Sequence, residues 1–143
     1  MNILVSACLL GLKCRYDGKE VSNLEVLKIK EKYSLIPVCP EQLGGLSTPR
    51  PPAEIKNARV INNKNKDVTE EYKKGAEEAL KLAKIFDCKY AILKERSPSC
   101  GYGQIYDGTF SGKLIPGKGI TAELLIKNGI KVIADSRASE LKE

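Results

Sequence analysis

Short apolar runs recur along this chain and predict its β-strands. Five segments carry continuous apolar side chains without the strict alternation of a half-exposed strand: Asn2–Ser6, Leu35–Cys39, Arg59–Asn62, Lys89–Lys94 and Lys131–Ala134. Continuous runs of this kind are typical of parallel strands that helices cover on both faces. The pattern therefore predicts five buried strands.

Three segments between these runs carry apolar residues at helical spacing. Asn23–Tyr33 begins with an asparagine, a common N-cap residue. Thr69–Asp87 opens with an acidic first turn, which suits the positive end of the helix dipole, and Ile120–Asn128 stops at Gly129, a typical helix end. Because strands and helices alternate, residues 1–143 are predicted to form a single-domain, Rossmann-like α/β fold with a parallel sheet and helices on both faces.

Composition restricts the class of protein. Of 143 residues, 42% are hydrophobic and 29% charged, which is typical of a globular domain. We expect no membrane association, because no apolar stretch approaches the ~20 residues of a membrane span. Five cysteines without a secretory signal favour a reducing compartment, so we expect a cytoplasmic protein. The net charge of +6 suits anionic partners such as nucleotides or RNA, although solubilising lysines explain it equally well.

Three cysteines follow predicted strands. Cys8, Cys39 and Cys100 each come at or shortly after the end of an apolar run. If the strands are parallel neighbours, the three sulfurs meet outside the carboxyl ends of the strands, where open α/β sheets bind ligands. Three long loops rich in glycine and proline leave the same edge: Leu10–Asp17, Pro40–Glu54 and Ser97–Lys118.

Two further cysteines differ in their surroundings. Free cysteine often packs as a small hydrophobe, and this is the interpretation for Cys88, which lies beside Phe86. Cys14 lies in the same loop as Cys8. It is a candidate fourth ligand, a thiol next to the ligands, or a resolving partner for another cysteine.

The chain contains no histidine, so a metal site here would be built from thiolates. Such ligands favour zinc, copper(I) or iron–sulfur clusters. No pair forms Cys-x-x-Cys, which argues against a thioredoxin-type motif or a zinc ribbon. Three dispersed cysteines suit a [4Fe–4S] cluster with one iron left open, although four cysteines are the usual set.

Two polar residues lie next to the candidate ligands. Glu41 follows Cys39 closely, and Ser97 shortly precedes Cys100. A carboxylate beside a metal can act as a general base, and a serine can position a water molecule. The alternative is structural, with Glu41 pairing within its loop and Ser97 forming a turn with Pro98.

Arginines flank all three loops. Arg15, Arg50 and Arg96 can hold a phosphate or carboxylate by forked hydrogen bonds. Alternatively, these arginines pair with Asp17 and Glu54 in the same loops.

Three motifs together resemble the thiouracil desulfidase family, small cytoplasmic iron–sulfur proteins formerly described only as a domain of unknown function. The motifs are Ser-Ala-Cys8-Leu-Leu-Gly with Cys14-Arg-Tyr-Asp-Gly, Cys39-Pro-Glu-Gln-Leu-Gly-Gly-Leu with Thr48-Pro-Arg-Pro-Pro-Ala-Glu54, and Arg96-Ser-Pro-Ser-Cys100-Gly. The resemblance covers essentially the whole chain, and a chance match to all three motifs is hard to credit.

The resemblance implies a cofactor and a reaction. A [4Fe–4S] cluster would be held by Cys8, Cys39 and Cys100, with its free iron binding the thiocarbonyl sulfur of a thiolated pyrimidine. Water, positioned by Glu41 and Ser97, would displace the sulfur as hydrosulfide without net redox change. The chain would then be an enzyme of hydrolase or lyase type that acts on a C=S bond.

The implied substrates are thiouracil and 4-thiouridine nucleotides such as 4-thio-UMP, and the implied role is sulfur salvage from degraded RNA. Arg15, Arg50 and Ser99 are candidate substrate-binding residues, and Ser99 is also the alternative to Ser97 for positioning water. The resemblance leaves Cys14 unassigned, because it belongs to the motif although only three ligands are implied.

Two other functions remain as alternatives. A cluster of this kind can transfer sulfur to RNA, but such enzymes usually need an ATP-activating site and the chain has no phosphate-binding loop. A metal-stabilised nucleic-acid-binding module would use aromatic residues for base stacking, and the chain has no tryptophan and two phenylalanines. We therefore expect a small thiolated nucleobase or nucleotide as partner, without stable nucleic-acid binding.

Overall fold

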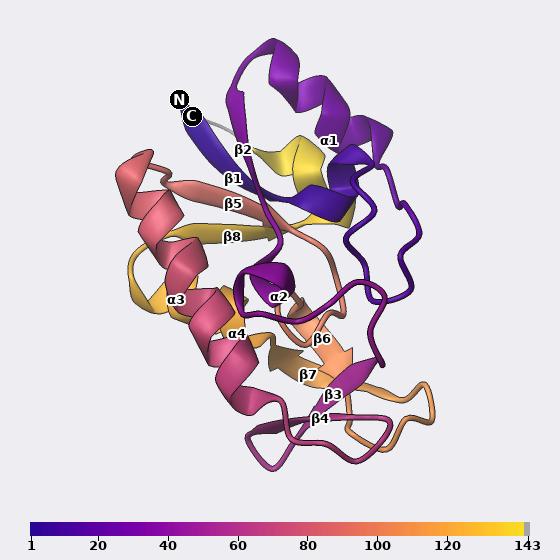
Figure 1. Cartoon of the computed structure of the whole chain (residues 1–143). Coiled ribbons are helices and arrows are strands. Elements are labelled where there is room, and N and C mark those ends of the chain that lie inside the picture. Colours follow the sequence, from indigo (N-terminus) through magenta and orange to yellow (C-terminus); the bar gives the residue numbers. More distant parts are fainter. Residues whose placement is uncertain (142–143) are drawn as a thin grey trace.

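A four-stranded parallel sheet forms the centre of the computed structural model, which describes residues 1–141 (Figure 1). The strand order in the sheet is β2-β1-β5-β8. In chain order, the strands, α-helices and 3₁₀ helices (η) are β1 (Asn2–Ser6), η1 (Ala7–Leu10), α1 (Leu24–Lys28), η2 (Ile29–Glu31), β2 (Ser34–Val38), α2 (Pro40–Leu43), β3 (Ala53–Lys56), β4 (Arg59–Asn62), α3 (Thr69–Ile85), β5 (Tyr90–Leu93), β6 (Tyr102–Tyr106), β7 (Leu114–Lys118), α4 (Ile120–Lys127), β8 (Lys131–Ala134) and η3 (Asp135–Glu140).

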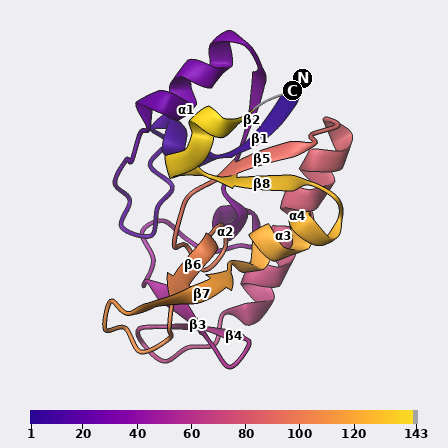
Figure 2. The same cartoon turned by 180° about the vertical axis from the view of Figure 1, so that it is seen from behind.

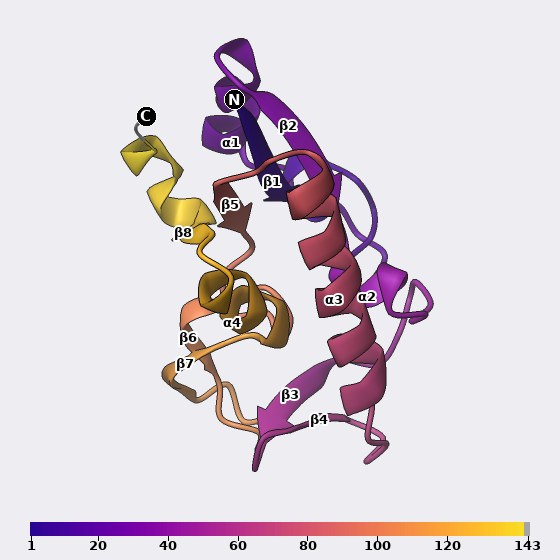
Figure 3. The same cartoon turned by 90° about the vertical axis from the view of Figure 1, so that its left-hand side faces the viewer.

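Helices cover both faces of this sheet, as predicted. Successive side chains of a strand point to opposite faces. Leu4 of β1 therefore packs in the core cluster that contains residues of α3 and α4, whereas Ile3 and Val5 pack with Val26 of α1 and Ala138 of η3. Figures 2 and 3 show the two layers from behind and from the side. The continuous apolar runs are explained by this double cover.

The predicted helices are present with shifted ends. Asn23 caps α1, its side-chain oxygen accepting hydrogen bonds from the backbone N–H groups of Glu25 (3.0 Å) and Val26 (3.3 Å). The segment predicted as one helix to Tyr33 divides into α1 and η2. The chain turns after α4 at Gly129, whose φ of +81° suits glycine. Within residues 1–141, no helix has the length and apolar character required to cross a membrane.

The prediction that Arg59–Asn62 belongs to the parallel sheet is wrong. This segment is β4, which pairs antiparallel with β3, so the sheet has four of the five predicted strands. Asn57 and Ala58 form the turn between them with φ values of 51° and 61°. A two-residue turn reverses the chain into a hairpin, whereas parallel neighbours need a long crossover connection.

Two of the predicted loops contain regular structure. Pro40–Glu54 includes α2 and the beginning of β3, and Ser97–Lys118 includes the antiparallel pair β6 and β7. Both hairpins lie on the carboxyl-end side of the parallel sheet (Figure 1). They therefore form walls around the edge at which the cysteines were expected.

Helix α2 lies against α3 at two glycines. A Cβ atom at Gly75 would overlap the carbonyl oxygen of Pro40, and one at Gly44 would overlap that of Glu71. The two backbones therefore approach more closely than any side chain allows. This contact fixes the short helix α2, together with Cys39 immediately before it and Glu41 within it.

Gly75→Ala is expected to destabilise the protein. In an ordinary helix interior alanine is more favourable than glycine by roughly 0.5–1 kcal/mol. Here the added methyl group must push α2 away, and overpacking of this kind costs typically about 1–3 kcal/mol. Chemical denaturation should show a lower free energy of unfolding than for Lys74→Ala, an exposed neighbour on the same helix. Equal stability of the two variants would contradict the close packing of α2 on α3.

Candidate functional site

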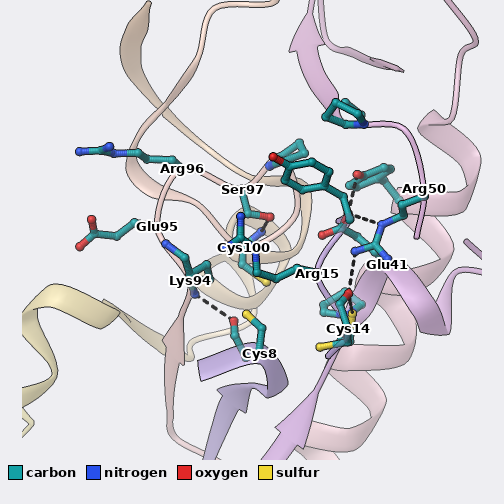
Figure 4. Close-up of a pocket in the computed structure, with 18 of the residues that line it drawn as sticks. Cys8, Cys14, Arg15, Glu41, Arg50, Lys94, Glu95, Arg96, Ser97 and Cys100 are labelled. Atoms are coloured by element: carbon teal, nitrogen blue, oxygen red, sulfur yellow. Dashed lines mark hydrogen bonds and ion pairs between the residues drawn. The ribbon is translucent and has the colours of Figure 1, made fainter. Parts of the chain in front are cut away.

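A cavity of about 430 Å³ lies beyond the carboxyl ends of the central strands. Four of the five cysteines line it: Cys8 in η1, Cys14 in the following loop, Cys39 at the end of β2, and Cys100 in the segment after β5. Figure 4 shows Cys8, Cys14 and Cys100 grouped together. Because β2, β1 and β5 are neighbours, the three strand-end cysteines converge as the sequence predicted.

Cys14 joins this group through contacts with two of the other cysteines. The Cys39 thiol donates a hydrogen bond of 3.6 Å to the backbone carbonyl oxygen of Cys14. The side-chain hydrogen bond with the Cys14 thiol, followed by burial, raises the pKa of the Cys39 thiol. For Cys14, the hydrogen bond with Cys39 lowers the pKa, but contact with Cys8 and burial outweigh it and the net direction is upward. Without a metal these thiols are therefore protonated at neutral pH.

Cys100 is the most deeply buried of the cavity thiols, with 5% of its surface exposed. Burial raises its pKa to about 12, although hydrogen bonds from Ser6 and Ser99 act in the opposite direction. A bound metal would displace the thiol proton, and the two hydroxyl groups would then stabilise the thiolate.

Glu41 is held by two donors on one carboxylate oxygen. The Tyr72 hydroxyl donates a hydrogen bond of 2.7 Å to Oε2, and Arg50 Nε donates one of 3.1 Å to the same atom. The ion pair is shielded, since the side chains of Arg50 and Glu41 are 5% and 15% exposed. The alternative in which Glu41 pairs within its loop is thus correct for one oxygen, and the residue also lines the cavity.

Arg50 donates mainly to groups of its own chain. Its terminal nitrogens bind the carbonyl oxygens of Ser47 (3.2 Å) and Cys14 (2.9 Å) and the hydroxyl of Thr48 (3.0 Å). With the bond to Glu41, these contacts use most of the five N–H donors of the guanidinium group. The arginine thus joins the cysteine loop to the carboxylate, and few of its donors remain for a phosphate.

Ser97 both forms a turn and faces the cavity. Its Oγ accepts hydrogen bonds from the backbone N–H groups of Ser99 and Cys100, each at 3.1 Å, which leaves its own proton for donation. Ser99 is fully buried, and its hydroxyl pairs with that of Thr121 at 2.8 Å. Of the two serines, Ser97 is the one on the cavity wall.

Basic side chains surround the mouth of the cavity. Arg15 lines it, forms an ion pair of 3.4 Å with Asp17 and lies over the ring of Tyr16. Lys94 and Arg96 also line it, and Figure 4 shows Arg96 directed away from the cysteines. The alternative in which Arg15 pairs with Asp17 is therefore present in the structure.

The sequence prediction missed the contribution of the β6–β7 hairpin. Tyr106 and Phe110 from this hairpin line the cavity. Glu54, expected to pair with an arginine, instead accepts hydrogen bonds from the backbone N–H groups of Gly108 (3.0 Å) and Phe110 (3.1 Å). Glu54 thereby holds the tip of the hairpin against the site.

Cys88 lies apart from this cavity. It is 5% exposed and packs in the core cluster beneath α3 and α4. The prediction that it is a packing residue is confirmed.

The donor set of the cavity fits an iron–sulfur cluster. Four thiols converge, and thiolate ligands favour such clusters. Among residues 1–141, no three histidine, cysteine, aspartate or glutamate side chains are arranged to hold a single metal ion. Cysteines around a cluster bind different iron atoms, so they do not have to share the coordination sphere of one ion.

Comparisons with known proteins cover nearly the whole chain. A family model described as 2-thiouracil desulfurase matches residues 3–137. The uncharacterized protein YbbK of Bacillus subtilis (strain 168) is 44% identical over 149 residues, which is 97% of this chain and 99% of that protein. The solved structure of the [4Fe-4S]-dependent thiouracil desulfidase TudS is 45% identical, with a TM-score of 0.91 over 98% of this chain and 94% of that chain.

Proposed function

Since this chain belongs to the 2-thiouracil desulfurase family, we propose that it is an iron–sulfur enzyme that removes sulfur from thiolated pyrimidines. The reaction replaces a C=S bond by C=O. One water oxygen forms the new bond to carbon, sulfur leaves as hydrosulfide, and no electrons are transferred. Thiouracil and 4-thiouridine nucleotides such as 4-thio-UMP are the proposed substrates.

One observation supports this function most strongly. Cysteines from three neighbouring strand ends share a cavity with a carboxylate and a serine that have free capacity for water or substrate. Cys8, Cys39 and Cys100 are the proposed ligands of a [4Fe–4S] cluster, because they lie in the segments that follow β1, β2 and β5, three neighbouring strands of the sheet. The cluster, when bound, supplies an open iron that acts as a Lewis acid toward the thiocarbonyl sulfur.

Glu41 is the proposed general base. Its Oε2 is occupied by Tyr72 and Arg50, so its Oε1 can accept a proton from the attacking water. Ser97 is the proposed partner of that water or of the substrate. Since its oxygen already accepts two backbone hydrogen bonds, we assign the Ser97 hydroxyl a donor role.

The remaining walls suit a pyrimidine nucleotide. Tyr106 and Phe110 offer aromatic surface for a flat ring. Arg15 and Lys94 supply positive charge at the mouth, where a 5′-phosphate would lie. We propose that these two side chains, rather than Arg50, select a nucleotide over the free base, because Arg50 is bound within the protein.

Anaerobic reconstitution with iron and sulfide tests this function. The expected product contains about four irons and four labile sulfides per chain. It should release one hydrosulfide for each uracil or UMP formed from the thiolated compound. Absence of hydrosulfide with both substrates would refute the proposal. Tight binding of zinc without iron would favour a metal-stabilised nucleic-acid-binding module, and transfer of sulfur to RNA would favour the reverse reaction.

Cys14→Ser tests whether three ligands are sufficient. We expect this variant to retain most of its iron, because the strand-end cysteines remain, and to lose its cluster faster in air. Iron content and the decay of visible absorption measure the two effects. Iron loss as complete as in Cys8→Ser would show that Cys14 is a ligand, and one of the three proposed cysteine ligands would then be assigned wrongly.

A further inference from the structure

We propose that Tyr72 is a positioning residue that orients the carboxylate of Glu41 for catalysis, an inference that rests on the proposed function. Tyr72 lies in the first turn of α3, and the two residues are 31 positions apart in the sequence. Tyr72 also lines the cavity, and its hydroxyl donates to Glu41, through which it acts.

The two carboxylate oxygens of Glu41 differ in their hydrogen bonds. Tyr72 and Arg50 both donate to Oε2, at 2.7 Å and 3.1 Å. Neither bond uses Oε1. A carboxylate restrained on one oxygen cannot rotate freely about its terminal bond, so the orientation of Oε1 is set before water or substrate arrives. Such preorganisation is the main way in which proteins increase the effectiveness of a catalytic group.

Tyr72 is itself rigidly placed. It is 2% exposed and packs in a core cluster with Val60 and Val68. Burial, followed by the nearby Glu41 carboxylate, raises the pKa of Tyr72, which keeps the phenol protonated and able to donate. The close contact of α3 with α2 at Gly75 brings the tyrosine and the carboxylate together.

Tyr72 gives a cleaner test than Arg50. Loss of the arginine would also release the carbonyl oxygens of Cys14 and Ser47, and would thus disturb the cysteine loop. Tyr72→Phe removes one hydroxyl group and preserves the buried ring. The matched control is Tyr90→Phe, because Tyr90 begins β5 at the end of the sheet away from the cavity.

Steady-state kinetics of the reconstituted variants provide the first test. Tyr72→Phe is expected to lower kcat about tenfold, equivalent to one hydrogen bond to a charged group, with KM and iron content within about twofold of the wild type. In a Glu41→Gln background the same change should have little further effect on kcat, since no carboxylate remains to be oriented. An equal decrease in both backgrounds, or a decrease that follows iron loss, would overturn the proposal.

Thermal unfolding of the cluster-free protein provides a readout that does not depend on activity. Tyr72→Phe should lower Tm by about 2–4 °C in the wild-type background, as expected for loss of one buried hydrogen bond in a chain of this size. The decrease should vanish in a Glu41→Ala background, where the hydroxyl has lost its acceptor. Equal decreases in both backgrounds would refute the contact itself. If the contact is verified while wild-type protein releases no hydrosulfide, the proposed function has failed and the positioning role falls with it.

Discussion

Cys39→Ser is expected to abolish both cluster binding and hydrosulfide release. Cys39 lies directly between β2 and α2. Its backbone position is therefore fixed by the sheet on one side and by the contact of α2 with α3 on the other, so no adjacent residue can move to supply a ligand in its place. A serine hydroxyl holds its proton far more firmly than a thiol and is a harder ligand, which iron in a sulfide cluster binds weakly. Anaerobic reconstitution followed by iron and labile-sulfide analysis measures the loss.

The matched control is Cys88→Ser. Cys88 is equally a free cysteine, but it packs in the core beneath α3 and α4 rather than in the cavity. This variant should retain the full complement of about four irons per chain, with at most a loss of stability. Normal iron content in Cys39→Ser would disprove its assignment as a ligand, whereas iron loss in both variants would indicate a general folding defect.

Glu41→Gln is expected to slow hydrosulfide release by at least about a hundredfold, because general-base assistance typically contributes about 10²–10⁴-fold in rate. Glutamine is nearly isosteric with glutamate, and its carbonyl oxygen can still accept the hydrogen bond from Tyr72. The variant should therefore keep its cluster and bind substrate normally. Rapid mixing with excess substrate, with hydrosulfide trapped over time, measures the chemical step.

Glu95→Gln serves as the matched control for this change. Glu95 also lines the cavity, but Figure 4 shows its side chain directed away from the cysteines. Its rate should stay close to that of the wild type. Undiminished hydrosulfide release by Glu41→Gln would remove Glu41 from the mechanism, and an equal loss in both variants would indicate an effect of cavity charge.

A comparison of Arg50 with Arg15 shows why a residue type alone does not define a role. Both arginines flank a cysteine loop in the sequence, and both were candidates for substrate binding. In the folded protein Arg50 is buried and bonded to Glu41 and Cys14, while Arg15 remains at the mouth. Arg50→Ala should thus impair the integrity of the site, whereas Arg15→Ala should lower the affinity for a phosphate.

The sequence by itself determined the elements whose signals are local. Four apolar runs became the central strands, Asn23 capped its helix, and Cys8 and Cys39 followed strand ends. These features depend on neighbouring residues and on side-chain periodicity, so they can be recognised without knowledge of distant contacts.

Only the tertiary structure decided which residues meet. The pairing of β4, predicted in the parallel sheet, with β3 in a hairpin depends on how the chain reverses, and the contribution of Phe110 depends on the tether at Glu54. The approach of Cys14 to Cys39 and the bond from Tyr72 to Glu41 join segments 25 and 31 residues apart. No local pattern encodes such pairs, because they arise only when α3 packs on α2 and the cysteine loop folds over the sheet edge.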